Sequence, residues 1–344
     1  MNPFGRIAIS ALIALASAHI PEPSSGGGHQ RSSGEGASLY AAVFSVRGSV
    51  SGMSTGGFGV FVREDGNLWR QVTLSNVFTF GLGFFEAGKS RRYYIAGGNG
   101  LHRSTDGGNS WRILTSWKTM EVLSVVPHPV DSATIYIATP WGVHKTVDDG
   151  ESWVEKMNGM RRWYVEDLLM DVRDPETLYA GSEDDLYRTT NGGELWKPMG
   201  VGGSPILAVM QHPVHHDLLL TGVEDGGVRF TTDGGMSWQS AEGLREKSIY
   251  AIASSADGKD LYAAGWETGL YRSDDNARSW RRIWNHPDVE GIFCILVDPA
   301  DPAGVFVGTD GDGVFESHDR GRSWRRAGLE GGKIKQIAIY PRSQ

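Results

Sequence analysis

An octapeptide that returns at a nearly constant interval is the feature of this 344-residue chain that most constrains its fold. Its clearest copy spans residues 104–111 and reads Ser-Thr-Asp-Gly-Gly-Asn-Ser-Trp. The closing tryptophan recurs at positions 69, 111, 153, 196, 238, 280 and 324, so the steps are 42, 42, 43, 42, 42 and 44 residues. A fixed period of this length predicts one supersecondary unit repeated in a solenoid or a propeller.

The residue types of the octapeptide suit a tight turn between two strands. Six copies keep most of the pattern, whereas the seventh, at residues 62–69, keeps only Glu64, Gly66 and Trp69. Glycine adopts positive φ without steric cost, and Asp, Ser and Thr side chains hydrogen-bond to turn amides that lack a ladder partner. The tryptophan is expected to bury its ring against the next blade. We therefore predict a structural role, rather than catalysis or metal binding, for the third residue of each copy: Asp106, Asp148, Asn191, Asp233, Asp275 and Asp319.

Each repeat contains four short segments with the composition of β-strands. In the third repeat they are residues 122–126, 134–138, 142–146 and 153–156, with the octapeptide between the last two. Four short strands in about 40–45 residues are typical of a propeller blade. The sequence thus predicts an all-β fold, a single seven-bladed β-propeller with four strands per blade.

The two ends of the chain predict how the ring closes. Residues 38–44 resemble residues 260–264, which form the second strand of their blade, so the first blade lacks its own first strand. Residues 334–340 read as a first strand with no blade after it. Pairing these two segments in one blade closes the ring and leaves no open sheet edge.

The N-terminus has the three-part pattern of an export signal. Arg6 precedes an apolar run at residues 7–18, which ends in the small residues Ala16-Ser17-Ala18. The run is too short to span a bilayer, and the alternative interpretation is a frayed apolar N-terminus. We expect a signal peptide at 1–18, a Gly/Ser/Pro-rich linker at 19–38 and the propeller at 39–344. The protein is then exported and either periplasmic or extracellular.

Charge and cysteine content narrow the classes of partner. A formal net charge of −8 argues against nucleic acid or an anionic membrane surface. Cys294 is the only cysteine and lies in an apolar run, so we expect a buried structural thiol. His128 and His212 fall in turns, and the pair His215-His216 has no further ligand at zinc spacing. We therefore expect a monomer with no metal site and no cofactor.

The octapeptides resemble the Asp-box, or bacterial neuraminidase repeat, over residues 39–340. Families with this repeat include sialidases, two-propeller xyloglucan-degrading glycosidases, sortilin-type receptors and photosystem II assembly factors, so the resemblance implies the fold more strongly than an activity. The Arg-Ile-Pro motif of sialidases is absent, since Arg6-Ile7 lies in the signal. Segments 269–273 and 305–310 look most like xyloglucanase blades. Those enzymes work in a cleft between two propellers, whereas the assembly factors are single propellers that bind without catalysis.

Loops on one face of the predicted propeller are rich in acidic and aromatic residues. In a propeller, the connections from second to third strands share a face with those that join one blade to the next. The carboxylates there, candidates for catalysis, are Glu183, Asp184, Asp185, Glu224, Asp225, Glu267, Asp310 and Asp312. The candidate ligand-binding aromatic residues are Trp117, Trp141, Trp163, Tyr164, Trp266 and Trp284. Such loops either bind a ligand or carry tryptophans that pack on neighbouring loops beside solvated acids.

The sequence favours non-catalytic binding of a protein or glycan through this loop-rich rim. The alternative is a glycoside hydrolase or lyase that acts on a polysaccharide through two of these carboxylates, which must stand about 5–10 Å apart. A purely structural extracellular module is a third interpretation. Two segments interrupt the repeat, at residues 46–58 and 84–92, and the first lies on the same rim.

Overall fold

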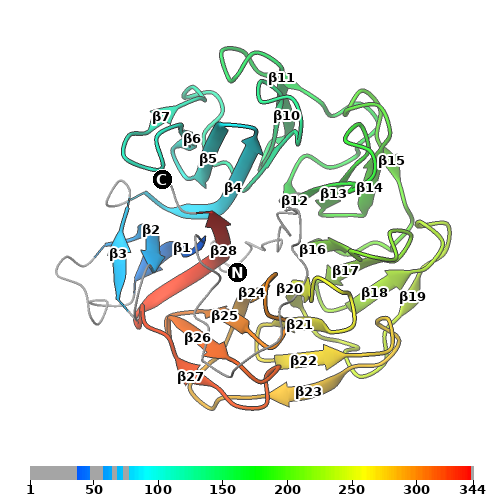
Figure 1. Cartoon of the computed structure of the whole chain (residues 1–344). Helices are drawn as coiled ribbons and strands as arrows, with labels where there is room; N and C mark the ends of the chain where they lie inside the picture. The colour runs from blue at the N-terminus through cyan, green and yellow to red at the C-terminus, as the bar shows by residue number, and fades with distance from the viewer. Residues whose placement is uncertain (1–36, 47–56, 64–67, 73–76, 342–344) are drawn as a thin grey trace.

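Seven four-stranded antiparallel sheets form a ring in a computed structural model of the chain (Figure 1). The structure describes residues 37–46, 57–63, 68–72 and 77–341. Within these ranges every regular element is a strand, which confirms the prediction of a seven-bladed all-β propeller. The predicted signal peptide, most of the linker and the interruption at 47–56 lie outside the described residues. The first strand begins at Ala37, two residues before the predicted start of the propeller.

The strands occupy equivalent positions in the seven blades, numbered from the blade that contains β1. The first, innermost strands are β28 (Gly332–Pro341), β4 (Thr79–Ala87), β8 (Ser124–Pro127), β12 (Val165–Met170), β16 (Ile206–Gln211), β20 (Ile249–Ser254) and β24 (Ile292–Val297). The second strands are β1 (Ala37–Val46), β5 (Ser90–Gly97), β9 (Ile135–Thr139), β13 (Leu178–Ser182), β17 (Leu219–Val223), β21 (Leu261–Gly265) and β25 (Val305–Thr309). The third strands are β2 (Gly59–Arg63), β6 (Gly100–Ser104), β10 (Gly142–Thr146), β14 (Leu186–Thr189), β18 (Gly227–Thr231), β22 (Gly269–Ser273) and β26 (Val314–Ser317). The fourth strands are β3 (Trp69–Gln71), β7 (Arg112–Ile113), β11 (Val154–Glu155), β15 (Lys197–Pro198), β19 (Gln239–Ser240), β23 (Arg281–Trp284) and β27 (Arg325–Arg326).

The ring closes through the two ends of the chain, as the sequence predicts. Strand β28 supplies the first strand of blade 1 and pairs antiparallel with β1, with Leu39 opposite Ile339 and Ala41 opposite Ile337. Figure 1 shows the red β28 beside the blue β1. Because the last segment of the chain completes the first blade, the ring is closed by main-chain hydrogen bonds.

The hydrophobic core lies in the seams between successive blades. A seam cluster joins Tyr136 and Val143 of blade 3 to Leu168 and Trp196 of blade 4, for example. The second strands are buried throughout in most blades because both faces of each blade are covered by neighbours. Each blade thus depends on the next one to bury its apolar face.

The octapeptides form hydrogen-bonded turns between the third and fourth strands. The Ser104 hydroxyl donates to Asp106 Oδ1 and accepts from Gly108 N, at 2.8 Å in both cases. Asp106 Oδ1 accepts from the Ser110 amide at 2.9 Å, and its Oδ2 accepts from the Ser110 hydroxyl at 2.5 Å. The same set of bonds forms at Asp148, Asp233, Asp275 and Asp319. Asn191 keeps the bonds to Thr189 and to the Leu195 amide.

These hydrogen bonds hold the octapeptide carboxylates in their charged form. The hydroxyl of Ser110 and the backbone bonds around it lower the pKa of Asp106 to about 2, and Ser152 does the same for Asp148. The pKa of Asp319 also falls to about 2 through Ser323. Since the oxygens of each carboxylate are occupied within its own turn, the geometry gives these side chains a structural role.

The octapeptide tryptophans pack against the preceding blade, so the prediction that they pack against the next one is wrong. The Trp153 indole donates to the carbonyl of Leu114 in blade 2 at 2.9 Å, and Trp196 donates to that of Lys156 in blade 3 at 2.9 Å. Trp238 and Trp69 bond in the same direction. Each tryptophan stands at the start of an outermost strand, where its ring meets the end of the previous blade's fourth strand.

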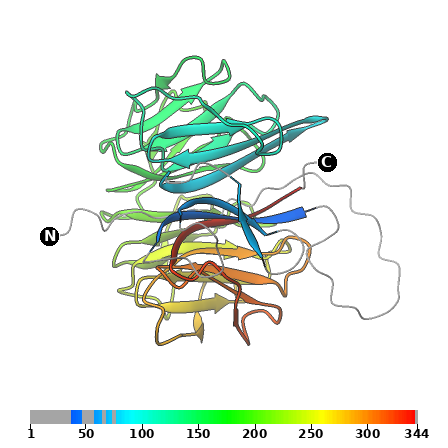
Figure 2. The same ribbon diagram turned by 90° about the vertical axis from the view of Figure 1, so that its left-hand side faces the viewer.

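The turn side of the propeller carries one long hairpin and two histidines that cap turns. The interruption at residues 84–92 is a long β4–β5 hairpin that projects beyond the ring (Figure 2), with Arg91 paired to Glu86 at 2.6 Å. His212 Nδ1 accepts from the amides of Val214 and His215, and His128 Nδ1 accepts from two amides of its own turn. Both histidines therefore cap turns between first and second strands.

Candidate ligand-binding face

Two sets of loops meet on one face of the ring, which we call the loop face. The β17–β18 loop of blade 5 is bonded on both sides: Glu224 N donates to Pro205 O at 2.9 Å and Gly227 N donates to Lys247 O at 2.8 Å. Pro205 and Lys247 belong to the connections that enter and leave blade 5. A loop between second and third strands therefore lies between two inter-blade connections, as the sequence predicts for this face.

Three predicted ligand-binding tryptophans are exposed on consecutive loops of this face. Trp117 lies between β7 and β8, Trp141 between β9 and β10, and Trp163 between β11 and β12. Their exposed fractions are 79%, 51% and 61%. The β9–β10 loop that carries Trp141 is the blade 3 equivalent of the β17–β18 loop in blade 5. Trp141 therefore lies between the connections that carry Trp117 and Trp163. We call these three residues the tryptophan row.

Tyr164 follows the tryptophan row and is surrounded by carboxylates. Burial raises its pKa well above the ordinary value, and the charges of Glu166, Glu121 and Glu183 raise it further. Glu166 also accepts a hydrogen bond from this tyrosine. Of these acids, only Glu183 was among the predicted candidates, so the structure brings together a carboxylate group of which the sequence revealed one member.

The acids of the β13–β14 loop have mainly structural partners. Asp185 accepts from the amides of Leu186, Gly200 and Val201 at 2.9–3.0 Å, so it orders the connection to blade 5. Asp184 Oδ2 accepts from the Tyr187 hydroxyl at 2.9 Å. Its other oxygen is buried, and the described residues offer that oxygen no hydrogen-bond partner. An orphaned buried acceptor of this kind calls for a water or a ligand.

The predicted acids of blades 5 and 6 stand at the tips of their loops. Asp225 and Glu267 are exposed and both have φ of 53°, in the left-handed region. Asp225 accepts from the Ser248 hydroxyl at 2.8 Å, whereas Glu267 N donates to Glu290 O at 2.6 Å. Glu224 is half-buried on the same loop as Asp225. Glu224 and Asp225 thus share the β17–β18 loop of blade 5, whereas Glu267 stands on the β21–β22 loop of blade 6.

The predicted acids of blade 7 are paired with cations. Buried Asp310 lies 3.2 Å from Lys333 Nζ, and Asp312 lies 3.9 Å from Arg326. Trp266 forms a bridge to Gly291, which Asp310 also contacts through its amide. Trp266, Asp310 and Lys333 thus converge where blades 6, 7 and 1 meet.

Trp284, the remaining predicted aromatic residue, packs within the fold. It lies in β23, and its ring stacks on Trp324 of the blade 7 octapeptide with centroids 4.9 Å apart. It also meets Phe315 at 5.1 Å. These contacts account for its ring without a ligand.

One bulged residue from each of six blades lies at the loop-face end of the innermost strand, and we call these residues the bulge ring. The register shifts of the first strands leave one extra residue in each of six blades: Phe80, Glu166, Leu207, Tyr250, Phe293 and Lys335. All six are buried. Leu207, Tyr250 and Phe293 belong to one apolar cluster together with residues of blade 1, so they gather at the centre of the ring.

Lys335 and Glu166 are the two charged members of the bulge ring. The Lys335 ammonium lies 4.2 Å from the centre of the Phe293 ring. Burial and, to a smaller extent, the Lys333 charge lower its pKa to about 7, against the opposing charges of Glu166 and Asp310. The sequence did carry a signal for both residues. The equivalent position of successive repeats, spaced at 41–43 residues, is otherwise apolar, and this spacing is close to the octapeptide period.

Neither a group of metal ligands nor a membrane-spanning helix is found among the described residues. No group of three or more His, Cys, Asp or Glu side chains in that part of the chain is arranged to hold a metal ion. Nor does it contain a helix with the length and apolarity that crossing a bilayer requires. Cys294 is buried, and burial raises the pKa of its thiol to about 12, which fits a structural thiol.

Comparison with known proteins supports the fold more than an activity. No protein-family model matches the chain. A xyloglucanase from Paenibacillus sp is 26% identical over 159 residues, which are 42% of this chain and 16% of that enzyme. The chain therefore spans about one sixth of the curated relative that it matches.

Solved structures of similar shape include a xyloglucanase, an extracellular domain of a one component system and a protein bound to a peptide. The GH74 xyloglucanase from Xanthomonas campestris has a TM-score of 0.61 at 18% identity, over 75% of this chain and 46% of that one. The extracellular domain of the one component system BT4673 from B. thetaiotaomicron gives 0.63 at 16%, over 80% and 38%. YCF48 bound to D1 peptide gives 0.56 at 16%, over 73% and 81%. At these identities the likeness establishes the propeller fold alone.

Proposed function

We propose that this chain is a non-catalytic propeller that binds a neutral polysaccharide across the loop face of blades 2–4. The observation that carries the proposal is the tryptophan row, Trp117, Trp141 and Trp163, exposed on three consecutive loops. Exposed indoles leave large apolar surfaces in water, and their gathering on one face favours a binding role. Flat aromatic rings suit the apolar faces of sugar rings.

Both acidic and basic side chains stand beside the row, the latter being Lys118, Arg161 and Arg162. Glu121, Glu166 and Glu183 all act on Tyr164, directly after Trp163. Carboxylate oxygens accept hydrogen bonds from sugar hydroxyls, which suits a polysaccharide ligand. The proposal also places the protein outside the cytoplasm, because the first 18 residues read as an export signal.

Hydrolysis of the polysaccharide is the second candidate function. It is supported by the carboxylates around Tyr164, since glycoside hydrolysis needs two such groups about 5–10 Å apart. Most of the acids predicted for this role are held by local partners: Asp185 by three amides and Asp310 by Lys333. We therefore rank binding above turnover.

Affinity gel electrophoresis tests the proposal. The purified protein is run through gels that contain xyloglucan, mixed-linkage glucan or polygalacturonate. We expect the neutral polymers to retard it, and the triple variant Trp117→Ala/Trp141→Ala/Trp163→Ala to bind at least about tenfold more weakly. Met236→Ala is the matched control, because Met236 is 85% exposed on the opposite face.

Three outcomes contradict the proposal. If the triple variant is retarded like the wild-type protein, the tryptophan row does not bind the polymer. If reducing ends are released and Glu166→Gln abolishes that release while the fold is retained, the protein is a hydrolase. If neither xyloglucan nor mixed-linkage glucan retards the protein, the neutral-glucan ligand is overturned and a peptide ligand becomes the next candidate.

A further inference from the structure

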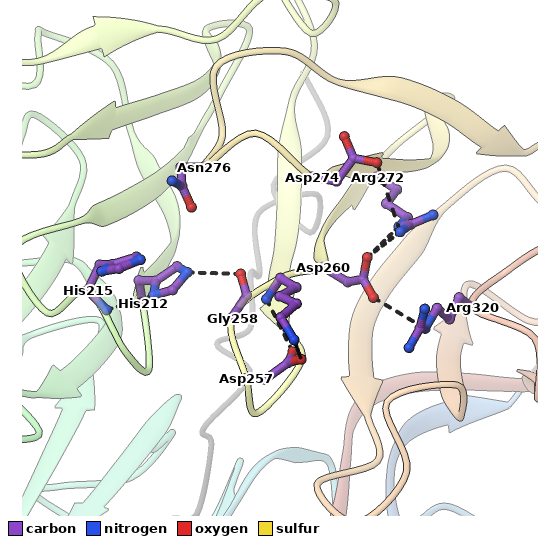
Figure 3. Close-up of a pocket in the computed structure, with 10 residues that line it drawn as sticks. His212, His215, Asp257, Gly258, Asp260, Arg272, Asp274, Asn276 and Arg320 are labelled. Atoms are coloured by element: carbon purple, nitrogen blue, oxygen red, sulfur yellow. Dashed lines mark hydrogen bonds and ion pairs between the residues drawn. The ribbon is translucent and has the colours of Figure 1, made fainter.

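A polar cavity lies on the octapeptide side of the ring, opposite the loop face. It has a volume of about 480 Å³ and is bounded by first-to-second-strand turns of blades 5 and 6 and by the octapeptides of blades 6 and 7 (Figure 3). Charged and imidazole side chains line it, including His215, Lys259, Arg272 and Arg320. A second hollow of about 540 Å³ adjoins it and shares His215 and Asn276.

Arg320 occupies an octapeptide position that disfavours an arginine. Its φ is 62°, in the left-handed region. The octapeptides of blades 2, 4 and 5 have glycine at this position, whereas those of blades 3 and 6 have Asp149 and Asn276, with φ of 63° and 59°. Asp and Asn tolerate the left-handed region better than arginine does. A side chain that bears Cβ is strained in this conformation. The turn itself therefore does not explain why an arginine stands there.

Two guanidinium groups share one buried carboxylate on this wall of the cavity. Arg272 Nε donates to Asp260 Oδ1 at 2.8 Å, whereas Arg320 Nε lies 3.5 Å from Asp260 Oδ2. Asp260 is buried, and the Arg320 side chain is 49% exposed. Lys259 is paired with Asp257 at 3.1 Å, and Asp274 is paired with Arg281 at 3.4 Å. The lining therefore has three cations, Lys259, Arg272 and Arg320, and three carboxylates. Among these cations Arg320 has the longest ion-pair contact, and Asp274 is shared with Arg281 from outside the lining.

The opposite wall is held rigid and presents an imidazole. His212 is buried, with Nε2 bonded to Gly258 O at 2.9 Å and Nδ1 bonded to the His215 amide at 2.9 Å. The exposed ring of His215 stacks on it with centroids 4.9 Å apart. In Figure 3 the two histidines lie across the cavity from Arg272 and Arg320, and Asn276 lies above them. A ligand in the cavity thus meets donor groups from two sides.

We infer that this cavity binds an oxyanion, the carboxylate, sulfate or phosphate group of a small ligand, with Arg320 as the principal contact. Guanidinium groups form paired, charge-assisted hydrogen bonds with such anions, and a partly buried site strengthens them. A glycine at position 320 would relieve the backbone and lose this contact. The inference does not depend on the polysaccharide proposal, since the two sites lie on opposite faces.

Titration calorimetry with three probes tests the inference: inorganic phosphate, inorganic sulfate and galacturonate. The variants are Arg320→Gly and Arg320→Gln, and Arg322→Gln is the control because Arg322 is exposed on the same turn and does not line the cavity. We expect saturable binding of at least one probe, weakened about tenfold or more by both Arg320 variants and unchanged in the control. The probe bound most tightly identifies the anionic group.

The glycine variant separates binding from folding. Glycine fits the left-handed turn, so the melting temperature of Arg320→Gly should equal or exceed that of the wild-type protein while anion binding falls. Arg320→Gln keeps the strained backbone and should lose binding to the same extent. Unchanged affinity in both variants, or no saturable binding of any probe, overturns the inference. Polysaccharide retardation should be the same in all four proteins.

Discussion

The octapeptide turns and the loop face are the two ends of the same blades, and they differ in how closely they follow the repeat. At the turns, Asp106 and Asp148 form the same hydrogen bonds to residues of their own octapeptide. On the loop face, equivalent loops carry different residues: Trp141 in blade 3, Asp225 in blade 5 and Trp266 in blade 6. Repetition therefore marks what every blade needs in order to fold, and departure from it marks what one site needs.

The same contrast holds within a single residue type. The octapeptide residue Trp196 is 1% exposed and bonded to the preceding blade, whereas Trp163 is 61% exposed. At the turn end, Arg320 and Asn276 replace the glycine of other octapeptides, and both line the cavity. Departures from the repeat thus indicate candidate sites on both faces.

The largest expected effect comes from replacing one octapeptide tryptophan and one tryptophan of the loop face by alanine. Trp196→Ala removes a buried ring and its hydrogen bond, so we expect the free energy of unfolding to fall by about 3–5 kcal/mol. Trp163→Ala removes an exposed ring and should change it by less than about 0.5 kcal/mol. Urea unfolding followed by circular dichroism measures both. Equal losses in the two variants would break the distinction between structural and ligand-binding tryptophans.

A smaller effect is expected from removing one octapeptide charge. The pKa of Asp148 is lowered to about 2 in the folded protein, below its ordinary value of 3.8. Its contribution to stability is therefore complete above about pH 4 and is lost as the pH falls through about 2. At pH 5 the melting temperature of Asp148→Asn should lie a few degrees below that of the wild-type protein, and the gap should close near pH 2.

The control for that measurement is Asp288→Asn, which removes an equal charge from an exposed side chain outside the octapeptides. Its melting temperature at pH 5 should match the wild-type value. A gap for Asp148→Asn that stays constant from pH 5 to pH 2 would mean that the octapeptide hydrogen bonds do not stabilise the charged form.

The sequence predicted the fold well because its period is carried by local chemistry. Turn residues such as Asp148 and Gly150 act within eight positions, so the blades and the closing pair of β1 and β28 were evident from spacing. The direction in which Trp153 and Trp196 pack was predicted wrongly, since spacing does not reveal which neighbouring blade a side chain meets.

The candidate site was predictable only in part because its members come from different blades. The sequence left open whether each tryptophan outside the octapeptides binds a ligand or packs on its neighbours. In the structure Trp117 and Trp163 are exposed, whereas Trp284 packs on Trp324. Glu121, in the connection from blade 2 to blade 3, and Glu166, in the first strand of blade 4, both act on Tyr164. Such a grouping depends on the curvature of the ring, which no local pattern encodes.

Oxidative footprinting of the tryptophans tests the central claim most directly. The protein is oxidised with hydroxyl radicals, with and without the neutral polysaccharide that retards it most, and the oxidation of each tryptophan is measured by mass spectrometry. The account predicts that Trp117, Trp141 and Trp163 are protected by the polymer, while octapeptide residues such as Trp153 and Trp238 are unchanged. Protection of the octapeptide tryptophans, or none in the tryptophan row, would contradict the assignment of ligand binding to the loop face.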